Sequence, residues 1–177
     1  MGQEPLIMSP DGKSAKAYSL AVKDNVTAAY KYLTGPRWSM SPIMASGIIG
    51  NLIRENIANP AQTINDAHGT TAFGIACFNS KGKLPDYMGY VAERNLDPND
   101  LYSQLDFIAD FIIQGKHAGL TRAMMNPNLT VEQASFAFGK DFEVFAGANG
   151  RGYLNPVDPE HIERMRESLR VYKMFNP

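Results

Sequence analysis

The stretch SPIMASGIIGNLIREN, residues 41–56, places a carboxylate at the end of an apolar segment. Ser41 followed by Pro42 is typical of a helix start, because the hydroxyl caps free backbone N–H groups and proline fits the first helical position. At about 100° per residue, Glu55 then lies within about 20° of Ile48 on the helical wheel and continues the core-facing stripe. Burial and the helix C-terminus both raise a carboxyl pKa, as a general acid requires.

A second interpretation of Glu55 needs no chemistry. Most glutamates lie on protein surfaces, and one at a frayed helix end can turn to solvent beside Arg54. The helix alone leaves both interpretations open, so the residues that follow it must decide between them.

The composition of the chain limits the classes of function. Its 177 residues carry 17 Lys and Arg against 18 Asp and Glu, a net charge of −1 that gives no general attraction to nucleic acid or to anionic membranes. The single cysteine, Cys77, excludes an internal disulfide framework. We therefore expect neither nucleic acid as a partner nor a fold built for an oxidising compartment.

No segment approaches the roughly 20 apolar residues of a transmembrane helix, so no membrane insertion is expected. The N-terminal stretch MGQEPLIMSPDGKSAK contains Glu4 and an early proline and lacks the apolar run of a secretory signal. The chain is therefore expected to be made in the cytoplasm and, if it acts elsewhere, to be delivered by other components.

The pattern along the chain predicts one mostly helical domain with a small β insertion. Residues 1–23 are expected to form a polar arm or linker, and residues 24–177 the domain. The predicted elements are a helix from Asn25 to Leu33, the 41–56 helix, a hairpin or irregular sheet within 57–78, a helix capped by Asp86 and ending near Arg94, a helix opened by Asp97-Pro98, a helix after the capping box Thr130-Val131-Glu132-Gln133, and a last helix opened by Asp158-Pro159 with Ile162, Met165, Leu169 and Tyr172 on one face.

Several short motifs occur in an order that resembles one known family, the phage tail lysozymes, relatives of goose-type lysozymes and lytic transglycosylases. That family has a helix with Gly-Asn-Leu and then Glu-Ser-Gly, followed by a hairpin that reaches Gly-Ile-Ala-Gln-Trp. The matching residues are Gly50-Asn51-Leu52, Glu55, Asn59-Pro60 and Gly74-Ile75-Ala76, while Asn56-Ile57 and Cys77-Phe78 depart from the pattern.

Two later segments continue the resemblance, which covers roughly residues 25–172. NLDPNDLYSQLDFIADFI is similar to the family's Gln-Leu-Asp helix, with Asp110 where the family usually has Glu, and TVEQASFAFGKDFE is similar to its late AFxxxFE helix. The resemblance implies an α+β, mostly α, lysozyme-like fold, with a helical lobe, a small β hairpin and a cleft between them.

The resemblance also implies a function: a muramidase that cuts peptidoglycan glycan strands between N-acetylmuramic acid and N-acetylglucosamine. The family's catalytic acid falls on Glu55, and no cofactor is needed. The implied partners are peptidoglycan and, for delivery to the cell wall, a phage tail or a secretion apparatus, the latter with a cognate inhibitor.

A second catalytic carboxylate would complete a hydrolytic pair. Asp66, eleven residues after Glu55, is the candidate, with Thr71 helping to orient a water; the resemblance supports the order Glu, Asp, Thr. The alternative is that Asn65-Asp66 is only a turn, which these residues favour for backbone reasons.

Substrate contacts are expected from the backbone of Gly74, Ile75 and Ala76, since glycine permits close approach of an N-acetyl sugar. The alternative is an edge strand that only packs the hairpin.

Two rival functions remain open. Cys77 with His117 could act as the nucleophile and base of a cell-wall amidase, although no third orienting residue is identifiable. A lysozyme-fold module that only binds glycan, or a structural tail part, is the other rival.

Asp66, His68 and Cys77 match no usual zinc spacing, so no metal is expected.

Overall fold

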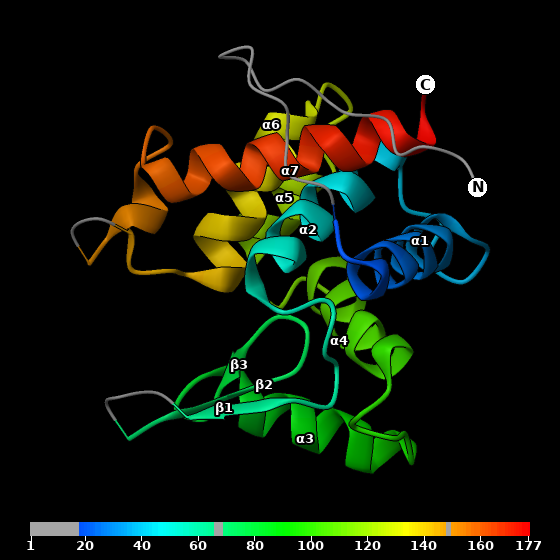
Figure 1. Cartoon of the computed structure of the whole chain (residues 1–177), viewed down its shortest axis with the longest axis vertical. Helices are drawn as coiled ribbons and strands as arrows, with labels where there is room; N and C mark the ends of the chain where they lie inside the picture. Colours follow the sequence, from blue (N-terminus) through cyan, green and yellow to red (C-terminus); the bar gives the residue numbers. More distant parts are fainter. Residues whose placement is uncertain (1–17, 66–68, 148–149) are drawn as a thin grey trace.

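The computed structural model of the chain describes residues 18–65, 69–147 and 150–177 (Figure 1). The described elements, in chain order, are α1 (Leu20–Thr34), α2 (Pro42–Glu55), β1 (Thr63–Asn65), β2 (Thr71–Phe73), β3 (Phe78–Asn79), α3 (Lys83–Arg94), α4 (Leu101–Ile113), α5 (Ala118–Met124), α6 (Val131–Phe138), the π-helix η1 (Gly139–Glu143), the 3-10 helix η3 (Gly152–Leu154) and α7 (Pro159–Phe175).

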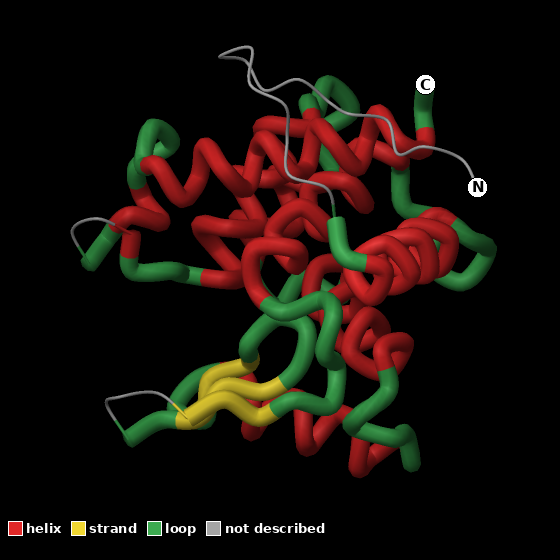
Figure 2. Tube along the Cα trace, viewed as in Figure 1, coloured by secondary structure: helices red, strands yellow, loops and turns green. Residues whose placement is uncertain are grey.

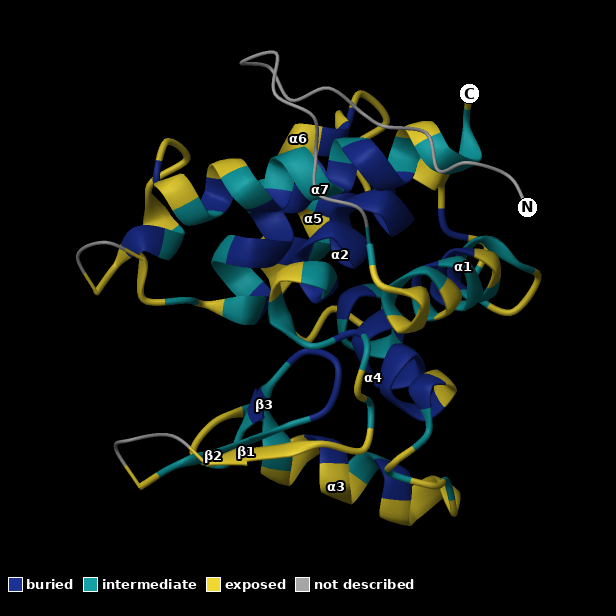
Figure 3. Ribbon diagram, in the orientation of Figure 1, coloured by how far each residue is buried: buried dark blue, intermediate teal, exposed yellow. Residues whose placement is uncertain are grey.

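Helix α2 is the centre of the helical lobe. The Ser41 hydroxyl caps it by accepting a hydrogen bond from the Met44 backbone N–H at 3.1 Å, as the sequence predicts. Every residue from Met44 to Leu52 is buried, and α2 packs chiefly against α7 and α6 (Figure 3). The polar residues Ser46 and Asn51 lie within this stretch and are also buried, so both face protein rather than solvent.

Helices α2 and α7 approach so closely because Gly50 has no side chain. A Cβ placed on Gly50 would lie 2.6 Å from the Cα of Ser168 on α7, inside the range that real Cβ atoms avoid. Neither helix can move away without opening the core that they share. The close approach matters for function because it fixes the register between the C-terminal end of α2 and the first turns of α7.

Gly50→Ala should therefore destabilise the fold. We expect a loss of about 1–3 kcal/mol from overpacking, which exceeds the gain of up to about 1 kcal/mol from the better helix former. Gly89→Ala is the matched control, because Gly89 lies in α3 and, apart from its chain neighbours and the backbone of its own helix, no described atom lies within 4 Å of the position that an alanine Cβ would take. Thermal unfolding should show a lower Tm for Gly50→Ala and an equal or higher Tm for Gly89→Ala; equal Tm values would contradict the packing argument.

The small lobe holds a three-stranded antiparallel sheet in the order β1-β2-β3 (Figure 2). Thr63 pairs with Phe73 and Asn65 with Thr71, while Phe73 also pairs with Phe78 on β3. Helix α3 packs against the sheet, and the rings of Phe78 and the buried Tyr87 stack with centroids 4.9 Å apart. Helix α4 lies between the two lobes in Figure 1. The α+β, mostly α architecture predicted from the sequence, with a helical lobe and a small antiparallel sheet, is confirmed.

Three predicted helix starts were wrong. Helix α1 begins at Leu20, because the Ser19 hydroxyl accepts from the Val22 N–H, and Asn25 instead donates to the Ile57 carbonyl at 2.8 Å. Helix α3 begins at Lys83, so Asp86 lies within its first turn. Helix α4 begins at Leu101; the Asp97 carboxylate closes a turn before it by accepting from the Asn99 N–H at 2.9 Å. The starts of α1 and α4 thus follow local hydrogen bonds that the sequence pattern did not single out.

The last two helix predictions differ in outcome. The capping box at Thr130 and Gln133 is confirmed, with both of its hydrogen bonds present. Helix α7 begins after Asp158 as predicted, but the apolar face chosen from its sequence is not the buried one: Ile162 is 40% exposed. The buried residues of α7 are His161, Arg164, Ser168, Arg170 and Val171.

Among the described residues, no helix is both long and apolar enough to span a membrane.

Candidate active site

Glu55 is the last residue of α2, where the helical lobe meets the sheet. The next residue, Asn56, donates its backbone N–H to the Ile75 carbonyl at 3.1 Å, which ties the end of α2 to the loop between β2 and β3. The Glu55 side chain is 17% exposed. The partly buried position predicted from the helical wheel is therefore confirmed, and the solvent-facing interpretation is not.

The carboxylate of Glu55 is held by Arg164, a residue of α7 that is 3% exposed. Its Nη2 donates to Glu55 Oε1, its Nη1 donates to Asn51 Oδ1 at 3.1 Å, and its Nε donates to Glu160 Oε1 at 3.1 Å. The guanidinium carbon also lies 4.4 Å from the centre of the Phe145 ring. These contacts fix the guanidinium on several sides and so orient the Glu55 carboxylate.

A cavity of about 390 Å³ opens in front of Glu55. Its walls come from the end of α2, the loop before β3, the start of α3, and the segment around η1. The lining residues are Glu55, Ala76, Cys77, Phe78, Asn79, Gly82, Lys83, Phe142, Glu143, Val144 and Phe145. Because both lobes contribute, the cavity corresponds to the cleft expected from the sequence.

Glu143 brings a second carboxyl to this cavity. It ends η1, a π-helical turn of the kind often found at functional sites, and the next residue, Val144, has a positive φ of 52°. Its Oε1 is shielded from solvent and accepts no hydrogen bond from any described residue. Burial and then the negative charge of Glu55 hold the pKa of Glu143 well above its ordinary value, while Arg164 and Lys83 oppose that shift.

Lys83 places a cation on the same cavity wall. Its Nζ donates to the Phe142 carbonyl at 2.5 Å and lies 4.6 Å above the Phe142 ring. Burial lowers the pKa of Lys83, while Glu143 acts in the opposite direction. The cavity thus combines two carboxyls with two basic groups, Lys83 on its wall and Arg164 behind Glu55.

Cys77 also faces the cavity, but its environment does not suit a nucleophile. Burial and the nearby negative charge of Glu55 raise the pKa of the thiol to about 12, so the reactive thiolate is scarce near neutral pH. His117 does not line this cavity. Its Nδ1 accepts from the Leu120 N–H at 3.0 Å as the cap of α5, and its Nε2 lies 3.9 Å from Asp141. The structure does not bring the proposed amidase pair together.

The residues predicted to bind substrate divide into two groups. Ala76 lines the cavity. Gly74 and Ile75 hold the loop: Gly74 has a φ of 79°, and the Ile75 N–H donates to Gln104 Oε1 at 2.7 Å while its carbonyl accepts from Asn56. Contact of Gly74 and Ile75 with a sugar therefore stays a prediction.

Of the two residues predicted to handle water, only Thr71 lies in the described part of the chain. Thr71 begins β2, and its backbone N–H donates to the Ser80 hydroxyl at 3.0 Å. It is absent from the cavity lining among the described residues. Asp66 and its neighbour His68 lie outside the described residues. The role predicted for Asp66 is therefore untested.

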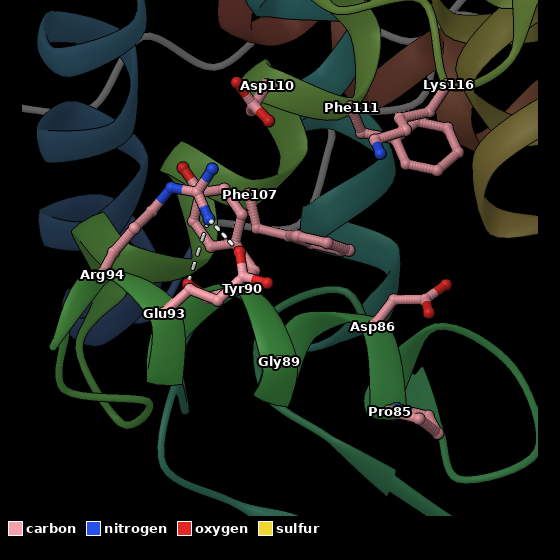
Figure 4. Close-up of a pocket in the computed structure, with 10 residues that line it drawn as sticks. All are labelled: Pro85, Asp86, Gly89, Tyr90, Glu93, Arg94, Phe107, Asp110, Phe111 and Lys116. Carbon is pink, nitrogen blue, oxygen red and sulfur yellow. Dashed lines mark hydrogen bonds and ion pairs between the residues drawn. The ribbon is translucent and has the colours of Figure 1, made fainter.

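A second pocket, of about 410 Å³, lies between α3 and α4 (Figure 4). Tyr90 and Phe107 form part of its wall with ring centres 5.5 Å apart, and Arg94 stacks on Tyr90 at 3.9 Å. Of its three acidic residues, Asp86 and Glu93 are exposed and Asp110 is half-buried. No carboxyl oxygen among the described residues of this pocket is both shielded and without a hydrogen bond, as Glu143 Oε1 is, so this pocket is the weaker candidate for acid–base chemistry.

Sequence reasoning missed Glu143, Arg164 and Lys83. Glu143 closes the AFxxxFE pattern noted in the sequence, so that motif was a usable signal for it. Arg164 carries no such signal, because a buried arginine has the same sequence appearance as a surface one. Lys83 begins α3, three residues before Asp86, where the sequence indicated the start of that helix.

Comparison with known families agrees with the geometry. The family model described as phage tail lysozyme matches residues 24–175. None of the curated proteins compared matches the chain.

Proposed function

Since the chain belongs to the phage tail lysozyme family, we propose that it is a muramidase that cleaves peptidoglycan between N-acetylmuramic acid and N-acetylglucosamine. Family membership by itself indicates a lysozyme-like action on peptidoglycan. The observation that carries the finer proposal is Glu55, a largely shielded carboxyl at a rigid helix end that faces a cavity between the two lobes.

In the proposed reaction Glu55 acts as the general acid. Cleavage of a glycosidic bond requires a proton on the leaving oxygen, and a carboxyl held beside the scissile bond can deliver it. Arg164 and the end of α2 hold that carboxyl in one orientation. The sugar residues next to the scissile bond would bind in the cavity of about 390 Å³.

The other site residues keep their proposed roles. We propose that Asp66, with Thr71, positions the attacking water, and that Gly74, Ile75 and Ala76 contact the N-acetyl sugar. Hydrolysis is the preferred outcome over transglycosylation, in which the sugar's own hydroxyl would attack and leave an anhydro end. Delivery by a phage tail or by a secretion apparatus, the latter with a cognate inhibitor, would bring the enzyme to the cell wall.

The test of the proposed function uses purified peptidoglycan and the full chain. We expect the suspension to clear while soluble fragments are released. A protein that sediments with the peptidoglycan but releases no fragments would instead be a glycan-binding or tail-structural module, and the muramidase proposal would fail.

Cys77→Ser separates the muramidase from an amidase. The thiol with its raised pKa is assigned a packing role, so the variant should keep most of the wild-type clearing rate. Digestion by either protein should release no new amino groups from the stem peptides. Complete loss of clearing in Cys77→Ser, together with free amines in wild-type digests, would favour the amidase.

A further inference from the structure

The cavity in front of Glu55 contains a carboxyl to which nothing above assigns a role. Glu143 lines the same cavity from a different element, η1, and its Oε1 accepts no hydrogen bond from any described residue. A shielded oxygen without a partner is unfavourable, because its hydration is lost and nothing replaces it. Such an oxygen in a cavity wall indicates a group that can accept a hydrogen bond from a ligand or a water in the cavity.

The cations near Glu143 are already engaged elsewhere. Arg164 directs its guanidinium N–H groups to Glu55, Asn51 and Glu160. Lys83 donates to the Phe142 carbonyl. Both still act on Glu143 through their charge, and Glu55 acts on it in the opposite sense. The groups that face Glu143 therefore come from α2, α3 and α7, and the negative charge of Glu55 opposes ionisation of Glu143.

We propose that Glu143 is the second catalytic carboxyl of the cavity: it shares one proton with Glu55 and accepts a proton from the attacking water. This inference rests on the proposed muramidase function. It deepens that function by naming a base, whereas Asp66 would position the water.

The proton balance of the step closes. Glu55 delivers its proton to the leaving oxygen as the bond from that oxygen to the sugar C1 breaks. The Glu143 carboxylate takes a proton from water, and the water oxygen forms the new bond to C1. One water is consumed, and the pair ends with one proton, now on Glu143, that returns to Glu55 before the next turnover.

The first test is Glu143→Gln in the full chain. Turnover on purified peptidoglycan should fall by about 100-fold or more, the usual contribution of a general base, while sedimentation with peptidoglycan is retained. Asp141→Asn is the matched control, because Asp141 lies on the same short helix, pairs with Lys140 at 3.0 Å and does not line the cavity. It should leave turnover unchanged. Wild-type turnover in Glu143→Gln would overturn the proposal.

A stability measurement separates catalysis from a structural role. Because the pKa of Glu143 is raised in the folded protein, the folded state binds more protons than the unfolded chain above pH 4.5, and wild-type stability falls as the pH rises through that window. Glu143→Gln removes this loss. The variant should match the wild-type Tm near pH 4 and exceed it near pH 8. A lower Tm at both pH values would show a structural role and overturn the proposal.

Chemical rescue gives the most specific result. Azide is an anionic nucleophile that needs no deprotonation, so it should restore cleavage in Glu143→Ala and form a glycosyl azide. The same anion should not rescue Glu55→Ala, which lacks the proton for the leaving group. No rescue of Glu143→Ala, or rescue of Asp66→Ala alone, would assign the base elsewhere and overturn the inference. Wild type that fails to cleave peptidoglycan would overturn the muramidase function itself, and this inference with it.

Discussion

Glu55→Gln should abolish the clearing of purified peptidoglycan. Glutamine has nearly the same shape but no acidic proton, so the leaving oxygen can no longer be protonated, and general acid catalysis of about 100-fold to 10,000-fold is lost. The fold should survive, because the amide oxygen of the new glutamine can still accept a hydrogen bond from Arg164. The carboxylate of Glu160 also remains as a counter-charge for the Arg164 guanidinium. The measurement is the initial clearing rate, with the Tm as a check on folding.

The control for this variant is Glu132→Gln, which removes an exposed carboxyl from the first turn of α6. It should clear peptidoglycan at the wild-type rate. Wild-type activity in a folded Glu55→Gln variant would remove Glu55 from the mechanism.

Arg164→Met should have the largest effect on stability. The substitution leaves the Glu55 carboxylate without its buried cation, while Glu160 keeps its ion pair with Arg54, and breaking a buried ion pair in this way costs about 3–5 kcal/mol. For a chain of this length that corresponds to a fall in Tm of roughly 6–20 °C. Clearing should also be lost, because Arg164 donates to the Glu55 carboxylate and fixes its orientation.

Arg166→Met is the matched control for Arg164→Met. It lies two residues along the same helix and pairs with Glu163 at 2.6 Å, but both side chains of that pair are partly exposed. A partly exposed pair contributes about 0–1 kcal/mol, so its loss should change the Tm little. Equal effects of the two substitutions would contradict the special role assigned to Arg164.

The parts of the fold that local chemistry determines could be predicted from the sequence. The Ser41-Pro42 start of α2, its apolar length and the Thr130 capping box all depend on residues next to one another in the chain. The wheel position of Glu55 followed from the same helix. The start of α1 could not be predicted in this way. The Ser19 hydroxyl caps the helix at Leu20, earlier than Asn25 would.

The buried face of α7 could not be found from the apolar pattern. The pattern favoured the face with Ile162, whereas the structure buries Arg164 and Ser168. Ser168 suits the face because α7 meets Gly50 there at close range, and Arg164 suits it because α2 and α7 itself supply polar partners. Both reasons lie largely in contacts between distant segments, which the sequence of α7 alone does not contain.

The second carboxyl shows the same limit at the level of the site. The sequence points to Asp66, because it follows Glu55 by eleven residues and fits the order Glu, Asp, Thr of the resemblance. Glu143 lies 88 residues after Glu55, yet the fold places both in the lining of one cavity. No sequence pattern predicts a π-helical turn followed by a positive φ at Val144. The direction of the Glu143 side chain could therefore not be predicted from the sequence.

The most direct test of the muramidase is mass spectrometry of the soluble products that the wild type releases from purified peptidoglycan. Cleavage of the glycan strand with water predicts disaccharide-peptides that end in an ordinary reducing N-acetylmuramic acid. Products lighter by one water would show an anhydro end and overturn the choice of hydrolysis. Intact glycan strands with freed stem peptides, or no soluble product at all, would contradict cleavage of the glycan by this protein.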